Sequence, residues 1–283
     1  MVDDRCSFRI NSDASIFFLR SYRRLNRERG RVGAAESPKR NVLVLTSTIR
    51  PPAGVPMLAR TNPVQRLADY CKAFEFYCRV PETHLSRIIF AENSESDLSP
   101  LVQIARKYDA LSRVEFLSFY GLDHPASYGR GYGEFKLLDY VLTNSSTLRN
   151  EDGSQLRIWK STGRYQVTNL KRLIDTAPDS FDLYCDLRRH PIPWVDLRVF
   201  AFTIRGYQTL LQGRYRNFRE DQMIDSPERY LHPIIEKMAA KHPITTRFRR
   251  EPYIDGVRGM DSQNYSKGAN LVKYLIRASM RFL

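Results

Sequence analysis

The chain has 283 residues, of which 42% are hydrophobic and 12% aromatic, and its formal net charge is +14. This composition excludes a disordered chain, and no apolar run approaches the ~20 residues of a membrane-spanning helix. The four cysteines form neither a CxxC pair nor a cluster with histidine, which favours buried thiols over a zinc site or a disulfide. The positive charge favours an anionic partner: nucleic acid, a membrane surface or a phosphorylated small molecule.

Residues 1–40 are predicted to form a basic N-terminal arm. Between residues 20 and 40, eight Arg or Lys stand against two Glu. The segment ends in Ser37-Pro38, which is typical of a linker. The acidic start, Met1-Val2-Asp3-Asp4, is unlike a secretory signal, so we expect a cytoplasmic protein. A purely solvated arm and an arm that binds an anionic partner both stay open.

Strands and helices alternate in the next part of the chain. Strands are predicted at residues 42–45, 86–91, 114–119 and 156–159, and helices at 63–79, at 98–108 and from Glu134. This alternation predicts an α/β sandwich with a mostly parallel sheet. Ligands of such sheets bind at the carboxyl ends of the strands, here Thr46–Thr48, Glu92–Ser94, Tyr120–Gly121 and Lys160–Arg164.

A glycine-rich segment, Gly129-Arg130-Gly131-Tyr132-Gly133, precedes the helix expected from Glu134. Alternate glycines let a backbone approach a ligand closely, and the first turn of a helix suits phosphate. Lys160 and Arg164 add fixed cations after the fourth strand. Together the backbone at Gly131, Lys160 and Arg164 predict a diphosphate site.

The remaining chain is less regular. A helix is expected at 170–174, strands at 181–187 and 197–203, and a helix at 227–238. The last segment, 271–283, is amphipathic, with Lys273, Arg277 and Arg281 at helical spacing beside an apolar stripe. A basic amphipathic helix lies on an anionic bilayer or packs on its own domain with the basic face in water.

These segments resemble the nucleotide-binding half of bacterial GT-A-type glycosyltransferases, of the kind that builds capsule, exopolysaccharide or O-antigen. Thr46-Ser47-Thr48 resembles the end of the family's first strand, and residues 88–97 resemble its acidic second turn, with Glu92 where an Asp contacts the nucleoside. Arg130-Gly131-Tyr132-Gly133 resembles an Asn-x-Gly turn, with Lys136 at the position of the motif's arginine. Residues 160–165 resemble a Lys-x-Thr-Gly-Arg-Tyr signature.

The resemblance implies a three-layer α/β/α sandwich. Residues 41–175 would form the nucleotide-sugar-binding half, 176–268 the acceptor-side half of the same domain, and 269–283 a basic amphipathic helix. The implied partners are a nucleotide-sugar donor, a lipid-linked glycan acceptor and the inner face of the plasma membrane, with no nucleic acid. The donor-binding residues it implies are Thr46, Thr48, Glu92, Asn93, Gly131, Lys136, Lys160 and Arg164.

One departure from the family concerns the metal ion. The family places an Asp-x-Asp at the end of the fourth strand, where this chain has Lys160-Ser161-Thr162. Hard cations need oxygen ligands, whereas a lysine repels a metal and neutralises a diphosphate itself. We therefore expect a metal-independent enzyme without a cofactor. Asp182 and Asp186 stand too far apart on a strand to share an ion, and a divalent metal stays a less favoured alternative.

Glycosyl transfer that inverts the configuration needs a base for the acceptor hydroxyl, and the resembled family carries an acid at the start of a later helix. Glu228 is the first candidate, with Asp225 and Asp221 as alternatives; Asp225 and Glu228 also suit capping of that helix. Asp196 and Arg198 share one face of a strand and either frame the acceptor or pair on the surface.

Two other functions stay open. The basic arm and the 16 tyrosines are compatible with a nucleic-acid-binding protein, although no known nucleic-acid-binding motif is visible. The missing Asp-x-Asp is compatible with a catalytically inactive glycosyltransferase-like scaffold.

Overall fold

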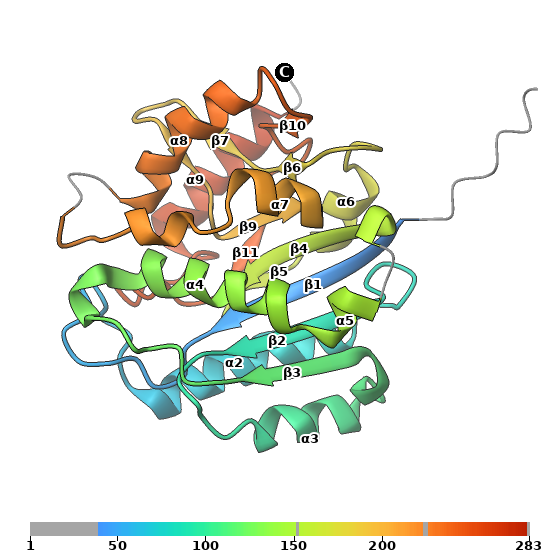
Figure 1. Ribbon diagram of the computed structural model, residues 1–283, viewed down its shortest axis with the longest axis vertical. Helices are drawn as coiled ribbons and strands as arrows, with labels where there is room; N and C mark the ends of the chain where they lie inside the picture. Colours follow the sequence, from blue (N-terminus) through green and yellow to red (C-terminus); the bar gives the residue numbers. More distant parts are fainter. Residues whose placement is uncertain (1–38, 151–152, 223–225, 282–283) are drawn as a thin grey trace, which may run out of the picture. The chain divides into compact units, whose positions relative to one another are not determined.

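The computed structural model describes residues 39–150, 153–222 and 226–281, so most of the predicted basic arm and Asp225 lie outside the described residues. Its centre is a seven-stranded sheet in the order β10-β6-β9-β4-β1-β2-β3 (Figure 1). The strands are β1 (Arg40–Ser47), β2 (Arg87–Glu92), β3 (Val114–Ser118), β4 (Leu156–Thr162), β6 (Leu183–Tyr184), β9 (Val199–Phe202) and β10 (Ile244–Thr245).

Every neighbouring pair in this sheet is parallel except the two pairs that β9 makes, with β4 and with β6. The carboxyl ends of β1, β2, β3 and β4 therefore lie along one edge. Two short antiparallel ladders complete the strands: β5 (Gln166–Val167) with β11 (Ile254–Asp255), and β7 (Leu187–Arg188) with β8 (Trp194–Val195). The predicted α/β class with a mostly parallel sheet is confirmed.

Helices cover both faces of the sheet (Figure 1). The first face carries α2 (Pro63–Cys78), α3 (Ser99–Lys107) and α6 (Leu170–Asp175); the second carries α4 (Gly129–Asn144), α5 (Ser146–Asn150), α7 (Ile204–Leu210) and α8 (Pro227–Met238). Strand side chains alternate between the two resulting cores: Leu43 and Leu45 face the first, Val42 and Val44 the second. The helix α9 (Gly268–Ser279) follows near the end of the chain.

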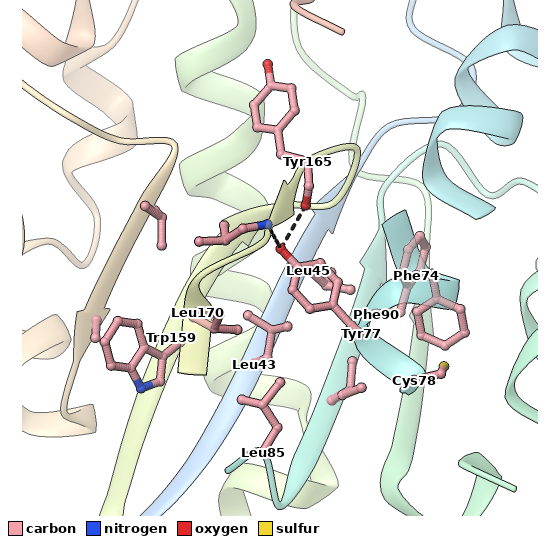
Figure 2. Packing of buried hydrophobic residues seen from close by; sticks show 14 of the residues in the cluster. Leu43, Leu45, Phe74, Tyr77, Cys78, Leu85, Phe90, Trp159, Tyr165 and Leu170 are labelled. Atoms are coloured by element: carbon pink, nitrogen blue, oxygen red, sulfur yellow. Dashed lines mark hydrogen bonds between the residues drawn. The ribbon is translucent and has the colours of Figure 1, made fainter. Parts of the chain in front are cut away.

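The first core fixes the backbone that follows β4 (Figure 2). The buried Tyr77 hydroxyl donates to the carbonyl of Tyr165 (2.8 Å) and accepts from the amide of Val167 (2.9 Å). Burial raises the pKa of Tyr77 to about 12, so this hydroxyl keeps its proton. The segment that carries Arg164 is thereby tied to α2.

Three differences from the predicted elements bear on the sheet or on its carboxyl edge. β4 runs to Thr162 rather than Trp159, because Lys160 to Thr162 continue the ladder with β1. α4 begins at Gly129 rather than Glu134, so the glycines belong to its first turns. The single strand expected at 181–187 is divided into β6 and β7, because Leu187 pairs with β8 outside the main sheet. Among the described residues, no helix combines the length and hydropathy that crossing a bilayer requires.

Candidate active site

A cleft of about 840 Å³ opens at the carboxyl ends of β1 and β4. Its walls come from the loops after β1 and β3, the first turns of α4 and α8, the segment before β11, and α9. Eight cationic side chains and four glutamates line it, so its charge suits an anionic ligand. The cations are Arg66, Arg130, Arg164, Arg198, Arg229, Arg258, Lys273 and Arg277, and the acids are Glu134, Glu220, Glu228 and Glu251.

Two predicted nucleotide-binding residues meet at the ends of β1 and β2. The Thr48 hydroxyl donates to Asn93 Oδ1 at 2.7 Å, and both residues line the cleft. The third residue predicted nearby, Glu92, is fully buried and does not line the cleft. Its carboxylate accepts the backbone amides of Ile49 (2.9 Å) and Ser94 (3.0 Å), so it holds the loops after β1 and β2 in shape.

An ion pair forms the floor of the cleft. Lys160 is fully buried, and its Nζ lies 2.7 Å from Glu134 Oε1, while the carbonyl of Leu197 accepts from the same ammonium at 2.7 Å. The hydroxyls of Thr46 (2.7 Å) and Thr162 (3.1 Å) also donate to Glu134 Oε1. Lys160, which was predicted to bind the diphosphate, is therefore paired with Glu134 and does not line the cleft, whereas Glu134 does.

Glu134 was not singled out from the sequence. Strand periodicity is the sequence signal that could have pointed to it. Thr46 of β1 and Lys160 and Thr162 of β4 occupy alternate positions, so all three project from the sheet face that α4 covers. Burial disfavours the charged carboxylate, but Lys160 and the two hydroxyls outweigh it and hold the pKa of Glu134 below its usual value. No donor among the described residues bonds its Oε2, so an ionised oxygen is free for a ligand hydroxyl.

Two arginines converge on the cleft from different elements. A Cβ built at Gly259 would lie 2.9 Å from Arg164 Nη2 and 3.8 Å from Arg130 Nη1, so both guanidinium groups meet beside this glycine. Among the described residues, the buried Nε atoms of Arg130 and Arg164 have no hydrogen-bond partner. Arg164 Nη1 donates to the carbonyl of Val257 at 2.9 Å. Two neighbouring guanidinium groups can together bind a phosphate or diphosphate.

The glycines of α4 serve protein contacts. A Cβ at Gly129 would lie 2.1 Å from the Glu220 carboxyl carbon, and one at Gly131 would lie 2.3 Å from Pro227 Cγ at the start of α8. The amide of Arg130 donates to Glu220 Oε1 at 3.2 Å. The helix end expected to hold phosphate therefore holds the carboxylate of Glu220, whose pKa burial raises.

The remaining predicted residues are divided between the cleft and its surroundings. Glu228 lines the cleft from the first turn of α8, which begins at Pro227 as expected. Its carboxylate accepts no hydrogen bond from the described residues. Lys136 does not line the cleft and pairs with Asp123.

Asp196 lies behind Arg198. Asp196 is fully buried, and its carboxylate accepts from Arg198 Nε at 2.8 Å and from Arg188 at 3.0 Å. Arg198 lines the cleft, with its guanidinium 4.8 Å from the ring centre of Tyr265. Of this predicted acceptor pair, Arg198 therefore faces the ligand space and Asp196 orients it.

The acidic side chains of the cleft are largely engaged with donors of the protein. Within residues 39–150, 153–222 and 226–281, no group of three or more His, Cys, Asp or Glu is placed to hold one. The carboxylate on the floor already carries the ammonium of Lys160, and Glu220 carries backbone amides. A hard cation here would therefore need oxygen ligands from outside these side chains.

No family model matches the chain, and no curated protein matches its sequence. Among solved structures, it is similar to the glycosyltransferase GlyE of Streptococcus pneumoniae, with 12% identity and a TM-score of 0.45, over 74% of this chain and 45% of that one. The chain thus spans less than half the length of GlyE.

Two further solved structures are similar. They are the galactosyltransferase LgtC in complex with donor and acceptor sugar analogues (10% identity, TM-score 0.42, 73% and 72% of the two chains) and a cytidylyltransferase from Leptospira borgpetersenii (13%, 0.39, 80% and 79%). At these TM-scores and identities the similarities carry no inference about activity, which has to be argued from the cleft.

Proposed function

We propose that the protein is a glycosyltransferase that takes its sugar from a nucleotide-sugar donor, with the donor diphosphate held by Arg130 and Arg164. The observation that carries this proposal is the convergence of the two guanidinium groups beside Gly259, in a cleft at the carboxyl ends of the strands. Glycosyl transfer leaves a negative charge on the departing diphosphate, and fixed cationic donors stabilise that charge.

The other residues of the cleft supply the remaining parts of the reaction. Thr48 and Asn93 contact the nucleoside, and Glu134 Oε2 accepts a hydrogen bond from a hydroxyl of the donor sugar. A carboxylate with a lowered pKa is a weak base, so Glu134 positions the sugar. Glu228, with a carboxylate that no described residue uses, takes the proton of the acceptor hydroxyl, and Arg198 orients the acceptor.

Metal independence, the acceptor and the cellular location are parts of the same proposal. The ammonium of Lys160 occupies the position where the resembled family carries metal ligands, and the cleft's arginines supply the positive charge. The capsule-type resemblance of residues 160–165 supports a lipid-linked glycan acceptor in surface polysaccharide synthesis, at the cytoplasmic face of the membrane.

Substitution of the two arginines tests the proposed diphosphate site. Arg130→Ala and Arg164→Ala should each weaken binding of UDP, GDP or CDP, whichever binds, about tenfold or more, since a hydrogen bond to a charged group contributes ~1.5–3 kcal/mol. Binding of the matching nucleoside without phosphates should not change. Titration calorimetry measures both, with Lys136→Ala as the matched cationic control outside the cleft.

Four outcomes would contradict parts of the proposal. Equal losses for diphosphate and nucleoside would remove the two arginines from the diphosphate site, and activity that vanishes with a chelator and returns with Mn²⁺ would refute metal independence. Steeply salt-dependent binding to duplex DNA without any nucleotide effect would support the nucleic-acid alternative. Nucleotide binding without sugar transfer to any glycan would support the scaffold.

A further inference from the structure

The outward face of α9 is apolar and has no partner among the described residues. Of the ten large hydrophobic side chains that are exposed among those residues, three lie on α9 (Val272, Leu275 and Ile276) and a fourth, Met280, is its C-cap; each is 55–57% exposed. Their spacing of three or four residues puts them on one side of the helix.

The opposite side of α9 is fixed to the protein. The rings of Tyr274 and Tyr253 lie 4.5 Å apart, and Arg281, just after the helix, donates to Asp186 and Glu251 at 2.6 Å each. The apolar side chains therefore cannot turn inward by rotation of the helix, because the rotation would break these buried ion pairs.

The same helix also borders the cleft. Lys273, Tyr274 and Arg277 of α9 line the cleft. Three more of the exposed hydrophobic side chains, Met57, Ile192 and Met260, also line it. Seven of these ten side chains thus belong to α9, to its C-cap or to the cleft, and the cleft also carries Lys273 and Arg277 of α9.

We propose that α9, together with the exposed hydrophobic side chains of the cleft, docks on the surface of an anionic lipid bilayer, so that the cleft receives an acceptor carried by a lipid. The acceptor part rests on the proposed function, and the docking part does not. Exposed Lys267 and Lys273 beside the apolar face complement anionic headgroups. A second copy of a chain with net charge +14, or the chain's own basic residues 20–40, would instead meet like charge.

Vesicle flotation of the full chain tests the docking. We expect binding to vesicles of phosphatidylcholine and phosphatidylglycerol in equal amounts, little binding to phosphatidylcholine alone, and weakening by salt. The double variant Leu275→Asp/Ile276→Asp should lose about tenfold or more in partitioning, since two apolar side chains no longer enter the interface. Leu111→Asp is the control. Leu111 is also exposed, but it directly precedes β3 and so lies at the amino end of that strand, away from the carboxyl ends that border the cleft.

Nucleoside-diphosphate binding in solution separates this proposal from the proposed function. Both aspartate variants should keep it, because none of their substituted residues lines the cleft. Equal flotation of the double variant and the wild type would overturn the docking proposal. So would a wild-type dimer that the double variant abolishes in analytical ultracentrifugation, since the apolar face would then be an interface between two copies.

Discussion

The carboxylate of Glu134 and the ammonium of Lys160 are unequally shielded from water. This difference determines how much unfolding free energy is lost when either charge is removed. Lys160 is fully buried, whereas a quarter of the Glu134 side chain is exposed. Glu134→Gln leaves a buried ammonium without its counter-charge and should cost about 3 kcal/mol in unfolding free energy. Lys160→Met should cost less, because the Glu134 carboxylate keeps two hydroxyl donors and some contact with water.

Urea unfolding of the two single variants and the double variant measures this difference. The double variant should be more stable than Glu134→Gln alone, since it contains no unpaired buried charge. A Lys160→Met variant that loses as much as Glu134→Gln would show that the two charges are equally shielded.

Asp196 makes the stability depend on acid pH. Burial opposes its ionisation, but Arg198 and Arg188 outweigh burial and hold the pKa of Asp196 well below its usual value. Its stabilising effect is therefore complete above the unfolded-state pKa of about 4 and is lost as the pH falls toward the folded-state value. Between pH ~5 and ~3, the unfolding free energy of the wild type should fall more steeply than that of Asp196→Asn.

Chemical denaturation at several pH values checks this expectation. Asp196→Asn should also be less stable than the wild type by about 3 kcal/mol at neutral pH, because Arg198 and Arg188 lose a charged partner. Parallel pH profiles for the two proteins would assign the acid dependence to other carboxylates.

At the scale of elements, the contact between α4 and α8 depends on a missing side chain. A Cβ at Gly131 would overlap Pro227, whereas a Cβ at Gly133 would make ordinary contacts, the nearest at 3.6 Å from His124. Gly131→Ala should therefore destabilise the fold by about 1–3 kcal/mol through overpacking. Gly133→Ala, two residues along the same helix, should be neutral or stabilise it by up to about 1 kcal/mol.

Thermal unfolding of the two variants measures the effect. Because α8 carries Glu228, displacing α8 in Gly131→Ala should lower transfer activity as well as stability. A Gly131→Ala variant as stable as Gly133→Ala would mean that α8 moves aside without cost.

The elements that the sequence predicted well have local signals. The apolar run at 42–45 and the Asn62-Pro63 helix start correspond to β1 and to α2, whose N-cap is Asn62. The end of β4 was missed because Lys160 is polar, and only its partner Glu134, 26 residues away, makes it fit inside a strand. The division between β6 and β7 depends on pairing with β8, which no local pattern reveals.

For the molecule as a whole, residues at strand ends could be placed at the cleft from the sequence. Thr48, Asn93 and Arg164 follow β1, β2 and β4 and line the cleft, because the carboxyl ends of parallel strands meet at one edge. Arg198 also lines the cleft, because it precedes the antiparallel strand β9, whose amino end lies at the same edge. Arg130 as a partner of Arg164, and Glu220 on the first turn of α4, depend on contacts between segments remote in sequence. The chain order alone does not specify such contacts.

The ion pairs of Arg281 have a mechanical consequence for a protein on a lipid surface. In the docked state that we propose, the ion pairs with Asp186 and Glu251 would keep α9 from rotating, so the cleft that α9 lines would keep one orientation relative to the headgroups. We then expect sugars close to their lipid carrier to enter the cleft more readily than the far ends of long glycans.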